Sequence, residues 1–259
     1  MHLLALPAFT DNYVWMLHDG RQAWVVDPGD AAPVASALDA RGLQLRGILV
    51  THHHPDHVGG VDALRARLEA VGGSVHGPAS ERMPEPCERH VDGDTIDVLG
   101  HRFEVLDVPG HTAGHIAYLQ RDADADPLLF CGDTLFSAGC GRLFEGTPAQ
   151  MAASLARLAA LPPGTQVCCT HEYTLSNLRF AAAVEPDNRE REAYAAQCAA
   201  RRASDEPTLP STIGVERAVN PFLRCSEPQV IAAARGQGSR GDDPIDVFAA
   251  LRSWKDRFR

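Results

Sequence analysis

The sequence contains almost no lysine: Lys255 is the only one, so arginine supplies 23 of its 24 basic residues. A phosphate-binding GxxxxGK loop is excluded, because Trp254 precedes that lysine where glycine is required. The serine-hydrolase pattern GxSxG also fails, since His76 stands where its last glycine should be. The dinucleotide pattern GxGxxG fails in the same way at Phe144. None of these three classes of enzyme is indicated.

No two of the seven cysteines form a CxxC pair, which excludes a zinc ribbon and a thioredoxin-type redox site. They show no framework of disulfides, so we expect a reducing, cytoplasmic environment. The first ten residues lack a charged segment, and Pro7 interrupts their apolar residues, so we expect no secretory signal. No window approaches 18 uninterrupted apolar residues, and we therefore expect no membrane-spanning segment.

Acidic residues outnumber basic ones by 34 to 24, for a formal net charge of -10. Nucleic acids and anionic membrane surfaces bind basic patches, so we expect neither as a partner. The 259 residues are 44% hydrophobic, which indicates a folded chain with room for one large domain or two smaller ones. We expect a monomer.

The first two thirds of the chain alternate short apolar runs with loops and helical patterns. The runs have the length and composition of strands: 24–26, 47–50, 103–108, 115–119, 128–131 and 165–169. Apolar periodicity predicts a helix over 61–71, and Thr147-Pro148-Ala149-Gln150 predicts the capped start of another over 151–161. Interleaved strands and helices define an α/β domain, which we place at residues 1–173.

Beyond residue 173 the strand-like runs disappear and alanine-rich helical stretches replace them. The segment 187–204 is one such stretch, whereas 205–212 is expected to be a loop and Asn220-Pro221 a turn. A final helix begins at Asp243-Pro244 and carries an apolar stripe that ends at Phe258. Residues 174–259 are therefore expected to form a smaller all-α domain.

The densest chemical signal is Thr51-His52-His53-His54-Pro55-Asp56-His57, an HxHxDH motif directly after a predicted strand. His111, Asp133 and His171 each follow the end of another predicted strand. Because strand ends of one sheet meet at one edge, these residues can converge on the motif. A histidine-rich surface loop is the alternative for the motif, and an isolated structural residue is the alternative for each of the other three.

Imidazole and carboxylate groups without thiolate favour a borderline divalent metal, with zinc preferred and iron or manganese as alternatives. A catalytic zinc normally uses three protein ligands, so seven candidates indicate two ions. The natural division assigns one group to each ion, with Asp133 shared: His52, His54 and His111 on one, and Asp56, His57 and His171 on the other. His53 should point away from the ligands. For His115, four residues after His111, a core role is favoured over contact with the metal ligands.

Six blocks of sequence occur in an order that resembles a known family: THHHPDHVGG, PGHTAGH, CGDTLFSAGCGRLFEG, THEYT, NPFLR and LRSWKDRF. The chain resembles the metallo-β-lactamase superfamily and, more narrowly, the glyoxalase II or hydroxyacylglutathione hydrolase family. The resemblance covers nearly the whole chain. It implies an αββα sandwich followed by a helical domain, and it places the seven metal ligands at the positions assigned above.

The resemblance also implies the substrate, a glutathione thioester such as S-D-lactoylglutathione, which is hydrolysed to glutathione and D-lactate in the second step of methylglyoxal detoxification. Its glutathione moiety would contact residues that match family positions: Arg142, Tyr173, Arg252 and Lys255. Some members carry tyrosine where this chain has Phe144, so a hydroxyl contact is lost there. The alternative for Arg252 and Lys255 is a solvated helix face.

The expected reaction is attack on the thioester by a hydroxide that bridges the two metals and that Asp56 and Asp133 help to orient. Other reactions known on such a scaffold are alternatives: those of a lactonase, a one-iron persulfide dioxygenase, a β-lactamase or an RNA-processing nuclease. Two complete ligand sets disfavour the one-iron enzyme, and the acidic charge disfavours the nuclease. A noncatalytic metal-storage protein is the alternative of a different class.

Overall fold

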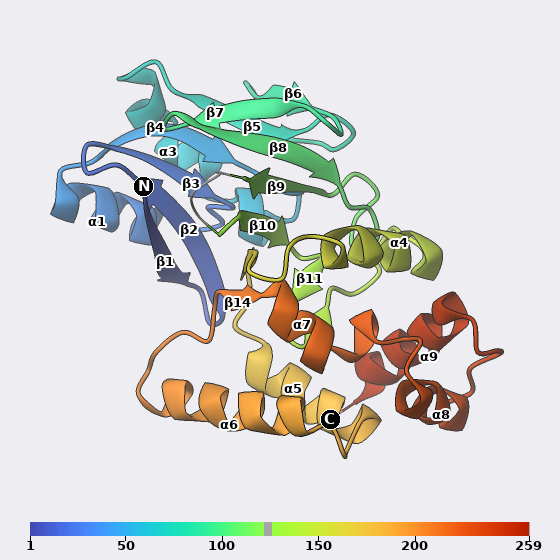
Figure 1. The fold of residues 1–259 in the computed structure, drawn as a ribbon. Coiled ribbons are helices and arrows are strands. Elements are labelled where there is room, and N and C mark those ends of the chain that lie inside the picture. The colour runs from blue at the N-terminus through green and yellow to red at the C-terminus, as the bar shows by residue number, and fades with distance from the viewer. Residues whose placement is uncertain (122–125, 259) are drawn as a thin grey trace. The chain divides into compact units, whose positions relative to one another are not determined.

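The computed structural model describes residues 1–121 and 126–258, which belong to two compact units (Figure 1). Unit 1 contains Met1–Asp107 and Ala113–Gly132, and unit 2 contains Val108–Thr112 and Asp133–Arg259. The domain boundary predicted at residue 173 lies within unit 2 and stays a prediction. No helix in the described ranges is long and apolar enough to cross a membrane.

Unit 1 begins with a six-stranded sheet in the order β1-β2-β3-β4-β5-β6. The first three strands are antiparallel and the last three continue from β3 in parallel. Its strands are β1 (His2–Ala8), β2 (Asn12–His18), β3 (Gln22–Val26), β4 (Gln44–Leu49), β5 (Ser74–Pro78) and β6 (Glu88–His90). The parallel part therefore ends at the short edge strand β6.

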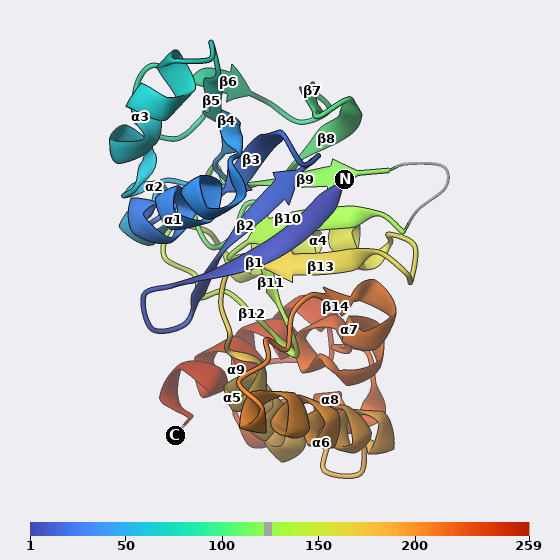
Figure 2. The ribbon, with the colours of Figure 1, turned by 90° about the vertical axis from the view of Figure 1, so that its left-hand side faces the viewer.

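Three helices connect the parallel strands: α1 (Ala31–Arg41), α2 (Pro55–Val58) and α3 (Val61–Glu69). Figure 2 shows α1 and α3 on one face of the sheet, where Leu38 and Leu64 join a core that includes Val25 and Ile48 from the strands. Asp30 caps the start of α1 by accepting from the N–H of Ala32. Burial of these apolar side chains is what attaches the two helices to the sheet.

A second group of strands in unit 1 is antiparallel: β7 (Thr95–Val98), β8 (His101–Asp107), β9 (Ile116–Gln120) and β10 (Leu128–Gly132). Phe130 of β10 packs against Phe103 of β8 and against Trp15 of β2, with ring centroids 6.1 and 6.4 Å apart. The Tyr118 hydroxyl also donates to the carbonyl of Val50, at 2.7 Å. These contacts hold the two groups of strands face to face.

Unit 2 is mainly helical (Figure 1). Its helices are α4 (Pro148–Ala159), α5 (Thr174–Val184), α6 (Arg189–Ala203), α7 (Ile213–Val219), the 3₁₀ helix η1 (Pro221–Leu223), α8 (Pro228–Gly236) and α9 (Pro244–Arg257). Its strands are short: β11 (Leu135–Phe136), β12 (Gly139–Cys140), β13 (Gln166–Cys169) and β14 (Ser211–Thr212). Phe180 of α5 packs against Phe222 and Trp254, which joins α5, η1 and α9 in one aromatic cluster.

Each strand predicted from an apolar run overlaps an observed strand, and the predicted helices correspond to α3, α4, α6 and α9. The capping box of Thr147 and Gln150 is present at the start of α4. The segment 205–212 is not entirely a loop, because Ser211–Thr212 pairs with β13 as β14. Strands β1, β2 and β5 and helix α1 are among the elements that were not predicted.

Candidate metal centre and substrate site

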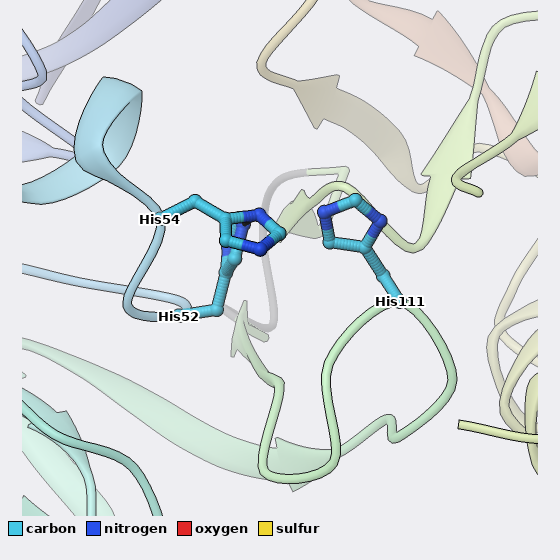
Figure 3. Close-up of side chains that lie close together, drawn as sticks. All are labelled: His52, His54 and His111. Carbon is cyan, nitrogen blue, oxygen red and sulfur yellow. Dashed lines mark hydrogen bonds between the residues drawn. The ribbon is translucent and has the colours of Figure 1, made fainter. Parts of the chain in front are cut away.

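The HxHxDH motif of unit 1 lies where β4 ends and the single-turn helix α2 begins. His54 precedes Pro55, whose fixed φ starts the helix, so the chain turns sharply within the motif. His52 and His57 are fully buried, with ring centroids 4.0 Å apart. His52 Nε2 lies 3.0 Å from His54 Nδ1, and Figure 3 shows these two rings beside each other. Unit 1 thus brings together the nitrogen donors of its own motif.

Asp56 joins this group on α2. Its Oδ2 atom lies 3.6 Å from His57 Nε2, and the same oxygen accepts a hydrogen bond of 3.2 Å from the side-chain amide of Asn12. A hydrogen bond from a side-chain amide fixes the orientation of the carboxylate. The four predicted ligands of unit 1 therefore form one cluster of three imidazoles and one carboxylate.

Asp27 was not predicted as a site residue, but its carboxylate contacts the segment that carries the motif. Its Oδ2 atom lies 3.1 Å from His57 Nδ1, and its carboxylate accepts from both the N–H and the hydroxyl of Thr51 at 2.8 Å. A carboxylate behind an imidazole fixes the ring and makes its other nitrogen a better ligand. Asp27 directly follows strand β3, so the rule that identified His111, Asp133 and His171 could have found it.

Two glycines let main-chain segments meet at this place. A Cβ atom on Gly29 would lie 1.8 Å from the carbonyl oxygen of Asp56, and one on Gly60 would lie 2.5 Å from that of Pro28. Real Cβ atoms do not come this close to a carbonyl oxygen. The turn after β3 therefore packs directly against the backbone of the motif.

The other histidines near the motif have separate roles. His53 turns to Glu81, whose Oε2 lies 2.7 Å from the His53 main-chain nitrogen and 2.9 Å from its Nδ1. His115 is fully buried just before β9 and stacks on His52, with ring centroids 4.5 Å apart. His115 therefore lies in the core, the role favoured from the sequence, and it also contacts a predicted metal ligand, which was the alternative role.

Unit 2 carries the remaining three predicted ligands, arranged around one carboxylate. Asp133 Oδ2 lies 3.4 Å from His111 Nε2, and Asp133 Oδ1 lies 3.4 Å from His171 Nε2. His111, on the loop that follows β8 (Figure 3), has its Nδ1 2.8 Å from the carbonyl oxygen of Arg142. That carbonyl can only accept, so Nδ1 carries the proton and Nε2 presents its lone pair toward Asp133.

The spacing within each set fits divalent metal ions. Two ligand atoms bound to zinc at about 2.05 Å with a tetrahedral angle are about 3.3 Å apart. The two ligand-atom pairs in unit 1 are 3.0 and 3.6 Å apart, and both pairs in unit 2 are 3.4 Å apart. The donors are imidazoles and carboxylates, which bind borderline divalent metals. The residues present therefore fit a divalent metal centre.

Two of the predicted substrate-binding residues are linked by Asp256. Arg252 donates to Asp256 Oδ1 at 2.9 Å, and Arg142 Nε lies 3.6 Å from the same oxygen. Arg252 is only 5% exposed, donates to the carbonyl of Cys140 at 2.9 Å and covers the ring of Phe222. The alternative of a solvated helix face is wrong for Arg252, because α9 packs that side chain into unit 2.

Tyr173 and Lys255 lie against aromatic rings. Tyr173 stacks on His171 with ring planes 3° apart, and its ring is partly exposed. Lys255 lies 5.5 Å above the ring of Phe180. Burial, helped by Arg252 and Arg179, lowers the pKa of Lys255 to about 8.

Phe144 is 63% exposed and packs edge-on against His111, at a ring-centroid distance of 5.2 Å.

Family models match two adjoining parts of the chain. The metallo-beta-lactamase superfamily model matches residues 8–171, more than half of the chain, and the model for the hydroxyacylglutathione hydrolase C-terminus matches residues 172–258. The chain is a metallo-β-lactamase superfamily protein with a helical C-terminal domain, as the sequence predicted. Within that superfamily it belongs to the hydroxyacylglutathione hydrolase family.

Curated relatives bear this out along the whole chain. The hydroxyacylglutathione hydrolase of Albidiferax ferrireducens is 60% identical over 258 residues, covering 100% of both chains. That of Pseudomonas aeruginosa PAO1 is 57% identical over 258 residues, covering 98% of both.

Solved structures share the fold. A crystal structure of ETHE1 from Myxococcus xanthus has a TM-score of 0.65 at 24% identity, covering 100% of both chains. That of TTHA1623 in a di-iron-bound form has a TM-score of 0.58 at 26% identity, covering 86% of this chain and 100% of the other.

Proposed function

We propose that this protein hydrolyses S-D-lactoylglutathione to glutathione and D-lactate, using a centre of two divalent metal ions. The observation that carries the proposal is the 60% identity, over its full length, to a hydroxyacylglutathione hydrolase. The two ligand clusters support it, because they supply imidazole and carboxylate donors at the spacing that divalent ions need.

The proposed centre combines the two clusters. All seven candidates lie within residues 8–171, which match one superfamily domain. One ion would be held by His52, His54 and His111, the other by Asp56, His57 and His171, with Asp133 shared. We propose zinc for both ions, with iron or manganese as the alternatives; the relative TTHA1623 was crystallised with two irons.

Divalent ions bound there would supply water activated at neutral pH and would stabilise negative charge on the thioester oxygen. The chain's own residues set up that chemistry. Asp27 fixes the ring of His57, Asn12 holds the carboxylate of Asp56, and the carbonyl of Arg142 fixes the tautomer of His111. Each of these groups orients one candidate ligand side chain.

The glutathione moiety carries two carboxylates, which need cations in a protein of net charge -10. We propose that Arg142, Arg252 and Lys255 supply them and that Tyr173 adds a hydroxyl. Because Asp256 links Arg142 to Arg252, both guanidinium groups are held in place before substrate arrives. The leaving thiol has a pKa of about 8.5, so it departs without a dedicated acid.

We further propose a cytoplasmic monomer with no nucleic-acid or membrane partner, in which residues 1–173 form the hydrolase domain and residues 174–259 the substrate-binding domain. The absence of paired cysteines supports a reducing, cytoplasmic environment, and the acidic charge argues against nucleic-acid and membrane partners. The two family matches meet close to the proposed domain boundary.

The test is release of free thiol from S-D-lactoylglutathione by the purified protein, before and after chelation and after metal is restored. We expect release that chelator abolishes and zinc restores. Absence of chelator-sensitive release would contradict the proposed function. Oxygen consumption in the same assay with glutathione persulfide would instead indicate the one-iron dioxygenase.

A further inference from the structure

A second group of histidine and carboxylate side chains lies in unit 1, apart from the HxHxDH motif in sequence. It consists of His76 on β5 and of Glu88 and His90 on β6, the edge strand of the six-stranded sheet. In the parallel register His76 pairs with Glu88 and Pro78 with His90. Alternate residues of a strand share a face, so the three side chains project from the same side of the sheet.

Their ligand atoms converge. His76 Nδ1 lies 2.9 Å from His90 Nε2 and 3.6 Å from Glu88 Oε2, and one atom from each residue lies within 4.8 Å of the other two. These separations bracket the value of about 3.3 Å expected for two ligands of one tetrahedral ion. The rings of His76 and His90 are stacked, with centroids 5.2 Å apart and planes inclined by 23°.

The outer nitrogen of each imidazole has its own partner. His90 Nδ1 faces the carboxylate of Asp94 at 3.5 Å, and Asp94 is itself held by the N–H of Val91. His76 Nε2 lies 2.8 Å from the hydroxyl of Ser74. A proton on His90 Nδ1 would face this carboxylate and would leave the lone pair of Nε2 directed toward His76.

In this tautomer, the lone pairs of His90 Nε2 and Glu88 Oε2 lie close to His76 Nδ1, so a single ion could contact all three atoms. A proton on His76 Nδ1 would form a hydrogen bond with His90 alone, whereas a divalent cation would be coordinated by all three atoms. Glu88 is 61% exposed, which leaves one side of the group open to a water ligand.

We propose that His76, Glu88 and His90 form a separate site for one borderline divalent cation of the zinc type, which links the edge strand β6 to β5. Two imidazoles and one carboxylate match the ligands that such ions select. Strand β6 has only three residues and, among the described strands, pairs with β5 alone, so a bound ion would add a further link between the two strands. The bound ion would fasten this edge and cover part of it against pairing with another chain.

The experiment measures zinc per chain after dialysis against graded free zinc, for the wild type and for the variants Glu88→Gln, His90→Gln and His2→Gln. The matched control is His2, whose ring stacks on His18 in the same sheet with centroids 4.9 Å apart. That pair belongs to no group of three metal ligands in the described ranges. Because Glu88 is exposed, Glu88→Gln should leave the fold intact.

We expect the wild type and His2→Gln to bind one ion more than Glu88→Gln and His90→Gln do, and zinc to raise their Tm by a larger amount. Thiol release should be the same in all four proteins. Equal zinc content in the four proteins at every free zinc concentration would overturn the proposal. Loss of thiol release in all four alongside the one-ion difference would contradict the proposed function and leave this site intact.

Discussion

The Nδ1 atom of His57 lies 3.1 Å from the carboxylate of Asp27, which also accepts two hydrogen bonds from Thr51. Asp27 thus fixes one predicted ligand and the residue that precedes the motif. Its backbone has φ of 52°, a conformation that asparagine tolerates well, so Asp27→Asn changes the charge without straining the turn. We expect metal affinity to fall by about 10- to 100-fold, because such supporting carboxylates typically contribute that much.

Competition with a chelator of known affinity measures this change. The matched control is Asp30→Asn, which alters a helix cap three residues later and should leave metal affinity unchanged. Unchanged affinity in Asp27→Asn would show that the contact with His57 does not affect the centre.

Asp133 is the carboxylate between His111 and His171. Asp133→Ala should remove metal and turnover together, with kcat/KM falling by at least about 10³-fold, since it would remove a ligand shared by both ions. Metal analysis and thiol release on the same preparation measure the two effects. A variant that keeps two tightly bound ions and full activity would contradict the shared assignment.

Lys255 tests the proposed contact with a substrate carboxylate. Lys255→Ala should raise KM by about tenfold in low salt and by less in high salt, because ions screen charge attraction. Lys255→Arg should also change the kinetics, since a planar guanidinium meets a carboxylate differently from an ammonium. An unchanged KM of Lys255→Ala at both salt concentrations would refute the assignment.

The lowered pKa of Lys255, about 8, predicts a pH dependence. The ammonium is present below that pH and lost above it, so kcat/KM of the wild type should fall as the pH rises through about 8. Lys255→Arg stays charged and should lack this fall. For stability the sign is opposite: the unfolded chain holds this proton up to about 10.5, so Lys255 contributes more stability as the pH rises above 8.

Asn220 begins the NPFLR block and joins three parts of unit 2. Its side-chain amide lies within 3.2 Å of the carbonyls of Phe136 and Gly139 and 3.0 Å from the buried carboxylate of Glu216. Asn220→Ala should lower the free energy of unfolding by about 3 kcal/mol, because it strands these buried acceptors. Asn188→Ala, which removes the cap of helix α6, should lower the free energy of unfolding by only about 1 kcal/mol. Denaturant titration of both variants measures the two changes.

The sequence predicts those parts of the molecule whose signal is local. The capping box at Thr147 and the start of α9 at Asp243 are determined by a few adjacent residues, and both are present. Strand β2 was missed although residues 13–17 form an apolar run of the kind that predicts the other strands, as expected for a strand buried along almost its whole length. Helix α1 was missed because the side that faces the core is built largely from alanine and valine, which give only a weak hydrophobic periodicity.

The site divides in the same way. The spacing of His52, His54 and His57 identifies them as candidate metal ligands. Asp27 is a single residue, and its role depends on its contact with His57, 30 positions later in the sequence. The burial of Arg252 likewise depends on Cys140 and Phe222, which are distant in sequence. The contacts of Arg252 follow from tertiary packing, which no local pattern encodes, whereas the position of Asp27 directly after a strand was a usable signal.

The close approach at Gly29 and Gly60 has a consequence for the protein's mutability. Main chain meets main chain there, so no side chain can rearrange to absorb an added methyl group. In a library of random variants selected for activity, these two positions should remain glycine even though neither carries a functional group. Directed evolution toward another metal or substrate would therefore have to change the ligands and the residues around them, because the loop that carries the motif cannot be reshaped at these points.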